Sequence, residues 1–163
     1  MFKDGARYNG IGPWMKEYFG GRTVKLAIDG GFTCPNRDGT LSSDGCIFCS
    51  SNGSGDFTSD RRLSITEQMR AQVEIMSEKW RSARFIAYFQ NFSNTYMPPN
   101  LFKEYISQAY AEKIVGIDVS TRPDCISEKY LEILAETGKD ITVELGLQTA
   151  NYNTLHRLNR GHG

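Results

Sequence analysis

The sequence lacks any apolar run of the roughly 20 residues that a membrane-spanning helix needs, and its first residues lack the apolar region of a signal peptide. It also lacks net charge, with 19 basic and 19 acidic residues, so no overall basic field points to nucleic acid. Cysteine is scarce, with four residues among 163. These absences predict a cytoplasmic protein with no membrane partner, in which clustered thiols are metal ligands or redox groups rather than disulfides.

Strand-like and helix-like segments alternate along the chain. Residues 1–22 form a lead-in with a short helix from Pro13 to about Phe19, and residues 23–163 form one further unit. Strands are predicted at 23–28, 85–89, 115–119 and 141–147, and the helices that follow them begin at Ser64, Pro98, Ser127 and near Asn151. The last helix is expected to be still running at Leu158. A strand–loop–helix pattern repeated four times predicts an α/β fold with a parallel sheet.

Three of the cysteines, Cys34, Cys46 and Cys49, lie in a loop rich in Gly, Asp and Ser directly after the first predicted strand. A structural zinc site would need a distant fourth ligand, such as Cys125. A redox Cys-x-x-Cys pair would leave Cys34 without a role. A [4Fe–4S] cluster held by three cysteines uses all of them and leaves one iron open. We favour the cluster; a non-catalytic zinc-binding module that uses the same cysteines remains the alternative function, and reduced cysteines without a ligand are the simplest structural explanation.

Polar residues follow the predicted strands at their carboxyl ends. Gln90-Asn91 follows the second strand, Ser120-Thr121-Arg122 the third and Gln148-Thr149 the fourth. Ligands of parallel α/β sheets bind at these strand ends, so we expect these side chains to share one site with the cysteine loop.

Strand periodicity predicts which side chains of the fourth strand face the interior. Glu144 and Gln148 share one face, and Val143, Leu145 and Leu147 share the other, which we expect to meet the helices. A buried carboxylate needs a partner. Glu144 and Asp118, which lies on the third strand, are therefore expected either to pair with Lys25 or Arg122 or to bind a ligand.

Several phrases of the sequence resemble those of radical S-adenosylmethionine (SAM) proteins. Residues 34–39 (CPNRDG) and 45–49 (GCIFC) resemble their cluster loop, in which an aromatic residue precedes the last cysteine. The usual spacing is C-x3-C-x2-C, whereas the first gap here is eleven residues, which is similar to a branch related to the radical SAM subunit of Elongator. The phrases STRPD at 120–124, VELGLQT at 143–149 and LNRGH at 158–162 resemble the same branch. The resemblance extends over essentially the whole chain.

The resemblance implies a partial (β/α) barrel with a [4Fe–4S] cluster at Cys34, Cys46 and Cys49. The open iron would bind the amino and carboxylate groups of SAM, and reduction would cleave SAM to a 5′-deoxyadenosyl radical that abstracts hydrogen from a substrate. A reductant such as flavodoxin or ferredoxin and an unknown substrate, with tRNA as a candidate, are the implied partners.

The resemblance also implies roles for individual residues. Gln148 and Arg160 would contact the methionine moiety of SAM, and Phe48 the adenine. The amino group and ribose would be bound by Gln90, Asn91 and Ser120. Arg122 and Glu144 are included as further cofactor contacts.

Other residues of interest are expected to be structural. Asn36 and Arg37 would brace the cysteine loop, and Arg37 would also offset the charge of a cluster. Tyr88 is expected to be core or lid, Cys125 a small buried side chain, and His162 a surface helix residue.

Radical SAM barrels normally use six βα units, whereas this chain is expected to end inside the fourth helix. The resemblance therefore implies the N-terminal portion of a barrel. An open sheet edge exposes unpaired backbone groups, so we expect the chain alone to self-associate or to be poorly stable, and not to be a competent catalyst.

Overall fold

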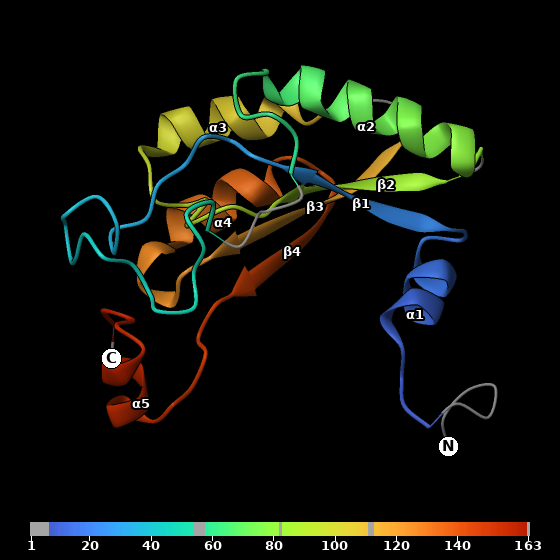
Figure 1. The fold of residues 1–163 in the computed structure, drawn as a ribbon. Helices are drawn as coiled ribbons and strands as arrows, with labels where there is room; N and C mark the ends of the chain where they lie inside the picture. Colours follow the sequence, from blue (N-terminus) through green and yellow to red (C-terminus); the bar gives the residue numbers. More distant parts are fainter. Residues whose placement is uncertain (1–6, 54–57, 82, 111–112, 163) are drawn as a thin grey trace.

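The computed structural model describes residues 7–53, 58–81, 83–110 and 113–162 (Figure 1). In chain order the elements are α1 (Ile11–Tyr18), β1 (Thr23–Ile28), α2 (Ile65–Lys79), β2 (Arg84–Phe89), α3 (Pro99–Gln108), β3 (Ile114–Thr121), the 3-10 turn η2 (Pro123–Cys125), α4 (Glu128–Ala135), β4 (Asp140–Leu145) and α5 (Tyr152–Arg157). The strands form one parallel sheet in the order β1-β2-β3-β4. The predicted α/β fold with four parallel strands is confirmed, and it is consistent with a partial barrel.

One face of the sheet carries the apolar core. Leu26 and Ile28 of β1, together with Phe85 and Phe89 of β2, alternate along their strands and are fully buried. They pack with buried side chains of the helices α2, α3 and α4, namely Met69, Phe102, Ile106 and Leu134. The opposite face, which we call the open face, bears polar groups at the alternate strand positions. Packing on one face therefore leaves the other free for a site.

Helix α2 begins at the capping box predicted from the sequence. The side chain of Ser64 accepts a hydrogen bond from the amide of Glu67, and the Glu67 carboxylate accepts one from the amide of Ser64. Among the residues described, no helix is both long and apolar enough to cross a membrane.

The final helix is shorter than predicted. Helix α5 ends at Arg157, before the predicted limit, because Asn159 adopts a left-handed φ of 51° and Gly161 one of 74°. Asn is one of the few residues other than Gly that tolerate this conformation. Residues 158–162, here called the return segment, therefore leave the helix and run back against the cysteine loop, so the prediction of a helix still running at Leu158 was wrong.

The predicted burial of the fourth strand is correct only for its first half. Ile141 and Val143 pack against the core, whereas Leu145 is 52% exposed and Leu147 51% exposed, although both were expected to meet the helices. Strand β4 is an edge strand and ends at Leu145, so Leu145 lacks a neighbouring strand on one side and Leu147 lies beyond the strand.

This exposed apolar edge leads to our prediction on self-association. We expect the chain to form oligomers at micromolar concentration, measured by light scattering after size-exclusion chromatography, because an unpaired strand edge can pair with another copy. Leu147→Lys should shift the population toward monomer. Ile75→Lys, which adds the same charge at an exposed position of α2, should leave it unchanged. A wild-type chain that is monomeric throughout this range would contradict the prediction.

Candidate functional site

A cavity of about 340 Å³ lies at the carboxyl ends of the strands, between them and the cysteine loop. All the predicted site residues except Asn91 line it, namely Cys34, Cys46, Phe48, Cys49, Gln90, Ser120, Arg122, Glu144, Gln148 and Arg160. They come from all parts of the chain between the first strand and the return segment. The sequence-based expectation that strand ends and cysteine loop share one site is met for these residues.

The cysteine loop is held by backbone hydrogen bonds of its own. The carbonyl of Cys34 accepts bonds from the amides of Arg37 and Asp38, at 2.8 and 3.1 Å, and the amide of Cys49 donates to the carbonyl of Cys46 at 3.0 Å. All three cysteines are free thiols; Cys34 and Cys46 are buried and Cys49 is half-buried. The loop thus presents three unpaired thiols to the cavity.

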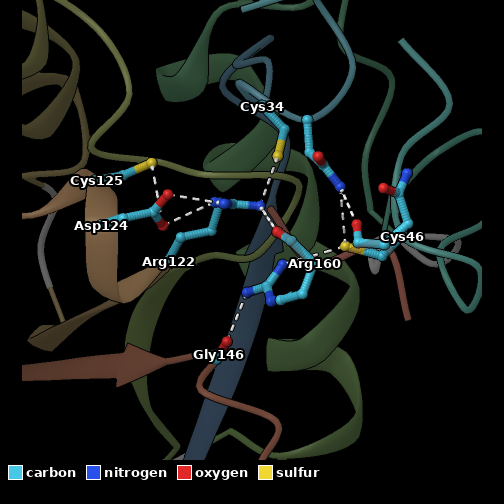
Figure 2. Close-up of polar contacts among 9 residues, drawn as sticks. Cys34, Cys46, Arg122, Asp124, Cys125, Gly146 and Arg160 are labelled. Atoms are coloured by element: carbon cyan, nitrogen blue, oxygen red, sulfur yellow. Dashed lines mark hydrogen bonds and ion pairs between the residues drawn. The ribbon is translucent and has the colours of Figure 1, made fainter. Parts of the chain in front are cut away.

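Cys46 lies among hydrogen-bond donors (Figure 2). Nδ2 of Asn36 and Nη1 of Arg160 are each 3.4 Å from its Sγ. A hydrogen bond from the Cys49 thiol, followed by the contacts of Arg160 and Asn36, lowers the pKa of Cys46 to about 5 despite its burial. The same hydrogen bond raises the pKa of Cys49. These contacts favour the thiolate form of Cys46, which is the form that binds metal.

Arg122 lies beneath Cys34, with its Nη1 4.0 Å from Sγ, and is only 2% exposed. The turn η2 brings the carboxylate of Asp124 back onto the guanidinium, with Nε to Oδ1 at 2.9 Å and Nη2 to Oδ2 at 2.7 Å (Figure 2). From the sequence, Arg122 was one of the two cations expected to pair with Asp118 or Glu144. Its ion pair is with Asp124 instead, because the 3-10 turn places that side chain closer.

The return segment fastens the cysteine loop. The amide of Ile47 donates to the carbonyl of Leu158 at 3.1 Å, and Nδ2 of Asn159 donates to the carbonyl of Gly45 at 2.8 Å. Asn36 donates through Nδ2 to the carbonyl of Asn159 at 2.5 Å. The bracing role expected of Asn36 is thus confirmed, and the part played by the return segment was not predicted.

Arg37 braces the far end of the same loop. Its Nη2 donates to the carbonyls of Cys49 and Ser50, at 3.1 and 2.5 Å, and its guanidinium lies over the ring of Phe92 at 5.7 Å from the ring centre. The expected bracing role of Arg37 is also confirmed.

The open face carries an ion-pair network that ends at the cavity. Nζ of Lys25 lies 2.6 Å from Oδ2 of Asp118 and 2.7 Å from Oε1 of Glu144. The hydroxyls of Tyr88 and Ser120 donate to Oε2 of Glu144 at 2.7 and 2.9 Å. Burial alone would raise the pKa of Glu144, but the bonds from Lys25, Tyr88 and Ser120 outweigh it and lower the pKa. Of the two alternatives for these carboxylates, pairing with Lys25 is the one observed.

Two residues lie differently from their predicted places. Tyr88, expected to be core or lid, lines the cavity, and its shared strand face with Gln90 would have indicated this. Asn91 does not line the cavity. It donates through Nδ2 to Oδ2 of the buried Asp29 at 2.7 Å, because successive residues of an extended chain point to opposite sides.

Cys125 and His162 were assigned no site role. Cys125 is half-buried beside Asp124, outside the residues that line the cavity, and burial raises its pKa to about 11. His162 lies on the return segment and not on a surface helix as expected. Burial lowers its pKa, and its Nε2 is enclosed with no hydrogen-bond partner among the residues described.

The cavity combines thiols with buried positive charge. In the described part of the chain, no three Cys, His, Asp or Glu side chains lie close enough together to hold a metal ion, so the geometry alone shows neither a zinc site nor an assembled cluster site. The three thiols instead line one cavity beside the buried cations Arg122 and Arg160. Nε of Arg160 is buried and has no hydrogen-bond partner among the described residues. Positive charge beside the thiols, with an unused N–H donor at Arg160, can accommodate a negatively charged group.

Comparison with known proteins agrees with this reading of the site. The family model for the radical SAM superfamily matches residues 33–163. The protein YtqA of Bacillus subtilis (strain 168) is 42% identical over 159 residues, covering 96% of this chain and 49% of YtqA. YhcC of Escherichia coli (strain K12) is 40% identical over 158 residues, covering 94% of this chain and 50% of YhcC. The chain thus spans about half the length of these relatives. It belongs to the radical SAM superfamily.

Proposed function

We propose that Cys34, Cys46 and Cys49 hold a [4Fe–4S] cluster with one iron open to SAM, and that the protein uses this pair for radical chemistry. The observation that carries the proposal is the meeting of three free thiols and the carboxyl ends of β2, β3 and β4 at one cavity. When bound and reduced, such a cluster supplies the electron that cleaves SAM to a 5′-deoxyadenosyl radical, which abstracts a hydrogen atom from substrate.

The chain's own residues would orient SAM within the cavity. Phe48 is half exposed and offers an apolar ring for the adenine. Glu144 is held ionised by Lys25 and Tyr88, so its carboxylate can accept a hydrogen bond from the amino group or the ribose. Gln148 lies beside Gly146, where an added Cβ would come within 3.2 Å of its Nε2, so glycine makes room for that amide.

Substrate and reductant follow by analogy alone. Resemblance to the branch related to the radical SAM subunit of Elongator makes tRNA the candidate substrate, and flavodoxin or ferredoxin the candidate reductant. Because the chain spans about half the length of these relatives, we propose the complete reaction for proteins of the relatives' full length.

Anaerobic reconstitution with iron and sulfide tests the cofactor proposal. We expect about four irons per chain, a reduced-state EPR signal, and a change in that signal when SAM is added, because SAM would occupy the open iron. Cys125→Ser should show the iron content and EPR signal of the wild type, since Cys125 does not line the cavity. A colourless protein that retains one zinc per chain after reconstitution would eliminate the proposal in favour of a zinc-binding module.

A further inference from the structure

The two buried arginines beside the thiols differ in how their charge is balanced. Arg122 is paired with Asp124 through two hydrogen bonds, at 2.9 and 2.7 Å. Arg160 is only 6% exposed, yet among the described residues no carboxylate forms an ion pair with it. Its Nη2 donates to the carbonyl of Gly146 at 2.5 Å, its Nη1 lies 3.4 Å from Sγ of Cys46, and its Nε has no partner there (Figure 2).

A buried cation without a counter-charge is costly, so proteins retain one only where an anion offsets it. The group that Arg160 contacts and that would carry negative charge as a cluster ligand is the sulfur of Cys46, 3.4 Å from Nη1. The charge of Arg160 is therefore balanced by the thiolates, or by the group that they hold. The charge of Arg122 is balanced by Asp124, so Arg122 adds much less net positive charge to the site than Arg160 does.

The position of the Arg160 charge is fixed by the fold. The carbonyl of Arg160 accepts a bond from Nη1 of Arg122 at 2.8 Å, which ties the return segment to the end of β3. Gly146 has no side chain, and a Cβ there would lie 2.9 Å from Nη2 of Arg160. The guanidinium therefore occupies a space that a glycine leaves open, and it cannot withdraw to solvent as a surface arginine would.

We infer that Arg160 is a positioning residue that raises the reduction potential of the cluster, an inference that rests on the proposed function. Reduction adds one negative charge to the cluster, and a fixed cation next to a ligand sulfur stabilises the more negative state more strongly. Net charge near the cluster and hydrogen bonds to its sulfurs are the established determinants of this potential. Arg160 supplies both at Cys46.

A redox titration of the reconstituted cluster, followed by EPR without SAM, tests the inference. Arg160→Gln removes the charge and keeps a donor. At a fixed potential we expect at least a tenfold lower ratio of reduced to oxidised cluster, equivalent to a midpoint about 59 mV more negative for one electron. Arg160→Lys keeps the positive charge, so its midpoint potential should stay close to that of the wild type. Arg157→Gln, the same change on the exposed end of α5, should not move the midpoint.

A second variant predicts a shift of the opposite sign. Asp124→Asn removes the carboxylate that neutralises Arg122, so the cluster should become easier to reduce and its midpoint should rise. If Arg160→Gln does not retain iron, this variant still tests the premise of the inference, which is that buried arginine charge beside the thiols shifts the midpoint. An Arg160→Gln midpoint equal to wild type, or an Asp124→Asn midpoint that is unchanged or lower, would overturn the inference while leaving the proposed function intact. Failure of the wild-type chain to assemble a four-iron cluster would instead overturn the proposed function.

Discussion

Cys46→Ser is expected to abolish assembly of the iron–sulfur cluster. Cys46 is the thiol with the lowered pKa of about 5, and it is the one that the Asn36 amide and the Arg160 guanidinium both contact. A serine hydroxyl is not ionised at neutral pH, so it would replace an anionic ligand by a neutral one. Anaerobic reconstitution followed by iron and sulfide analysis should show loss of the cluster and of its visible absorption.

The comparison with Cys125→Ser separates ligand loss from general damage. Cys125 is a free thiol outside the cavity lining, so its replacement should leave iron content at the wild-type level. Circular dichroism of both variants without iron should match that of the wild type, since no disulfide is lost. Full iron content in Cys46→Ser would show that the cluster is held elsewhere.

Lys25→Met is expected to lower the free energy of unfolding by about 2–3 kcal/mol. Removing one partner of a buried ion pair leaves an uncompensated charge, which costs roughly 3–5 kcal/mol when both groups are fully buried. Asp118 is only 3% exposed, but Lys25 and Glu144 are each about one-third exposed at the side chain, so solvent screens part of the loss. Urea denaturation provides the measurement.

Adding Asp118→Asn to Lys25→Met should recover most of the loss, because the amide removes the buried charge that lacks a partner. Lys103→Met, which breaks the exposed pair with Glu136, serves as the control and should change stability by less than about 1 kcal/mol. If Lys25→Met and Lys103→Met lowered the free energy of unfolding equally, the ion pair of Lys25 on the open face would contribute no more than an exposed pair.

The stabilisation by Lys25 should also depend on pH. The pKa of Glu144 is lowered in the folded chain, so its contribution is present above the unfolded value of about 4.3 and is lost as the pH falls through the folded value below it. The pKa of Lys25 is raised: burial alone would lower it, but the bonds to Asp118 and Glu144 outweigh burial, so its contribution persists up to about pH 10. The difference in free energy of unfolding between the wild type and Lys25→Met should therefore become smaller below about pH 4.

Elements with local signals were predictable from the sequence. Strand β1 has the predicted bounds, since its apolar residues stand between Gly21 and the polar cysteine loop. Helix α2 starts at the predicted Ser64 because a capping box needs only residues three apart. Convergence of the strand ends followed from parallel topology, which is why nearly all the predicted site residues share the cavity.

Features that depend on distant contacts were not predictable. The apolar spacing of Leu155 and Leu158 continues a helical pattern, and the left-handed conformation that follows at Asn159 is what ends the helix. That conformation is favoured by bonds from Asn159 to the cysteine loop, which cannot be read from neighbouring residues. The exposure of Leu145 similarly depends on its place at the edge of the sheet, which the alternation of apolar residues along the strand does not reveal.

The return segment also bears on the timing of synthesis. Cys46 and Arg160 are 114 positions apart, so at the usual rate of translation Cys46 precedes Arg160 by roughly 6–23 s. During that interval the nascent thiols lack both the arginine beside Cys46 and the bonds that fasten Gly45 and Ile47. We expect iron delivery during translation to meet an unfastened loop, so that stable loading follows release of the return segment from the ribosome.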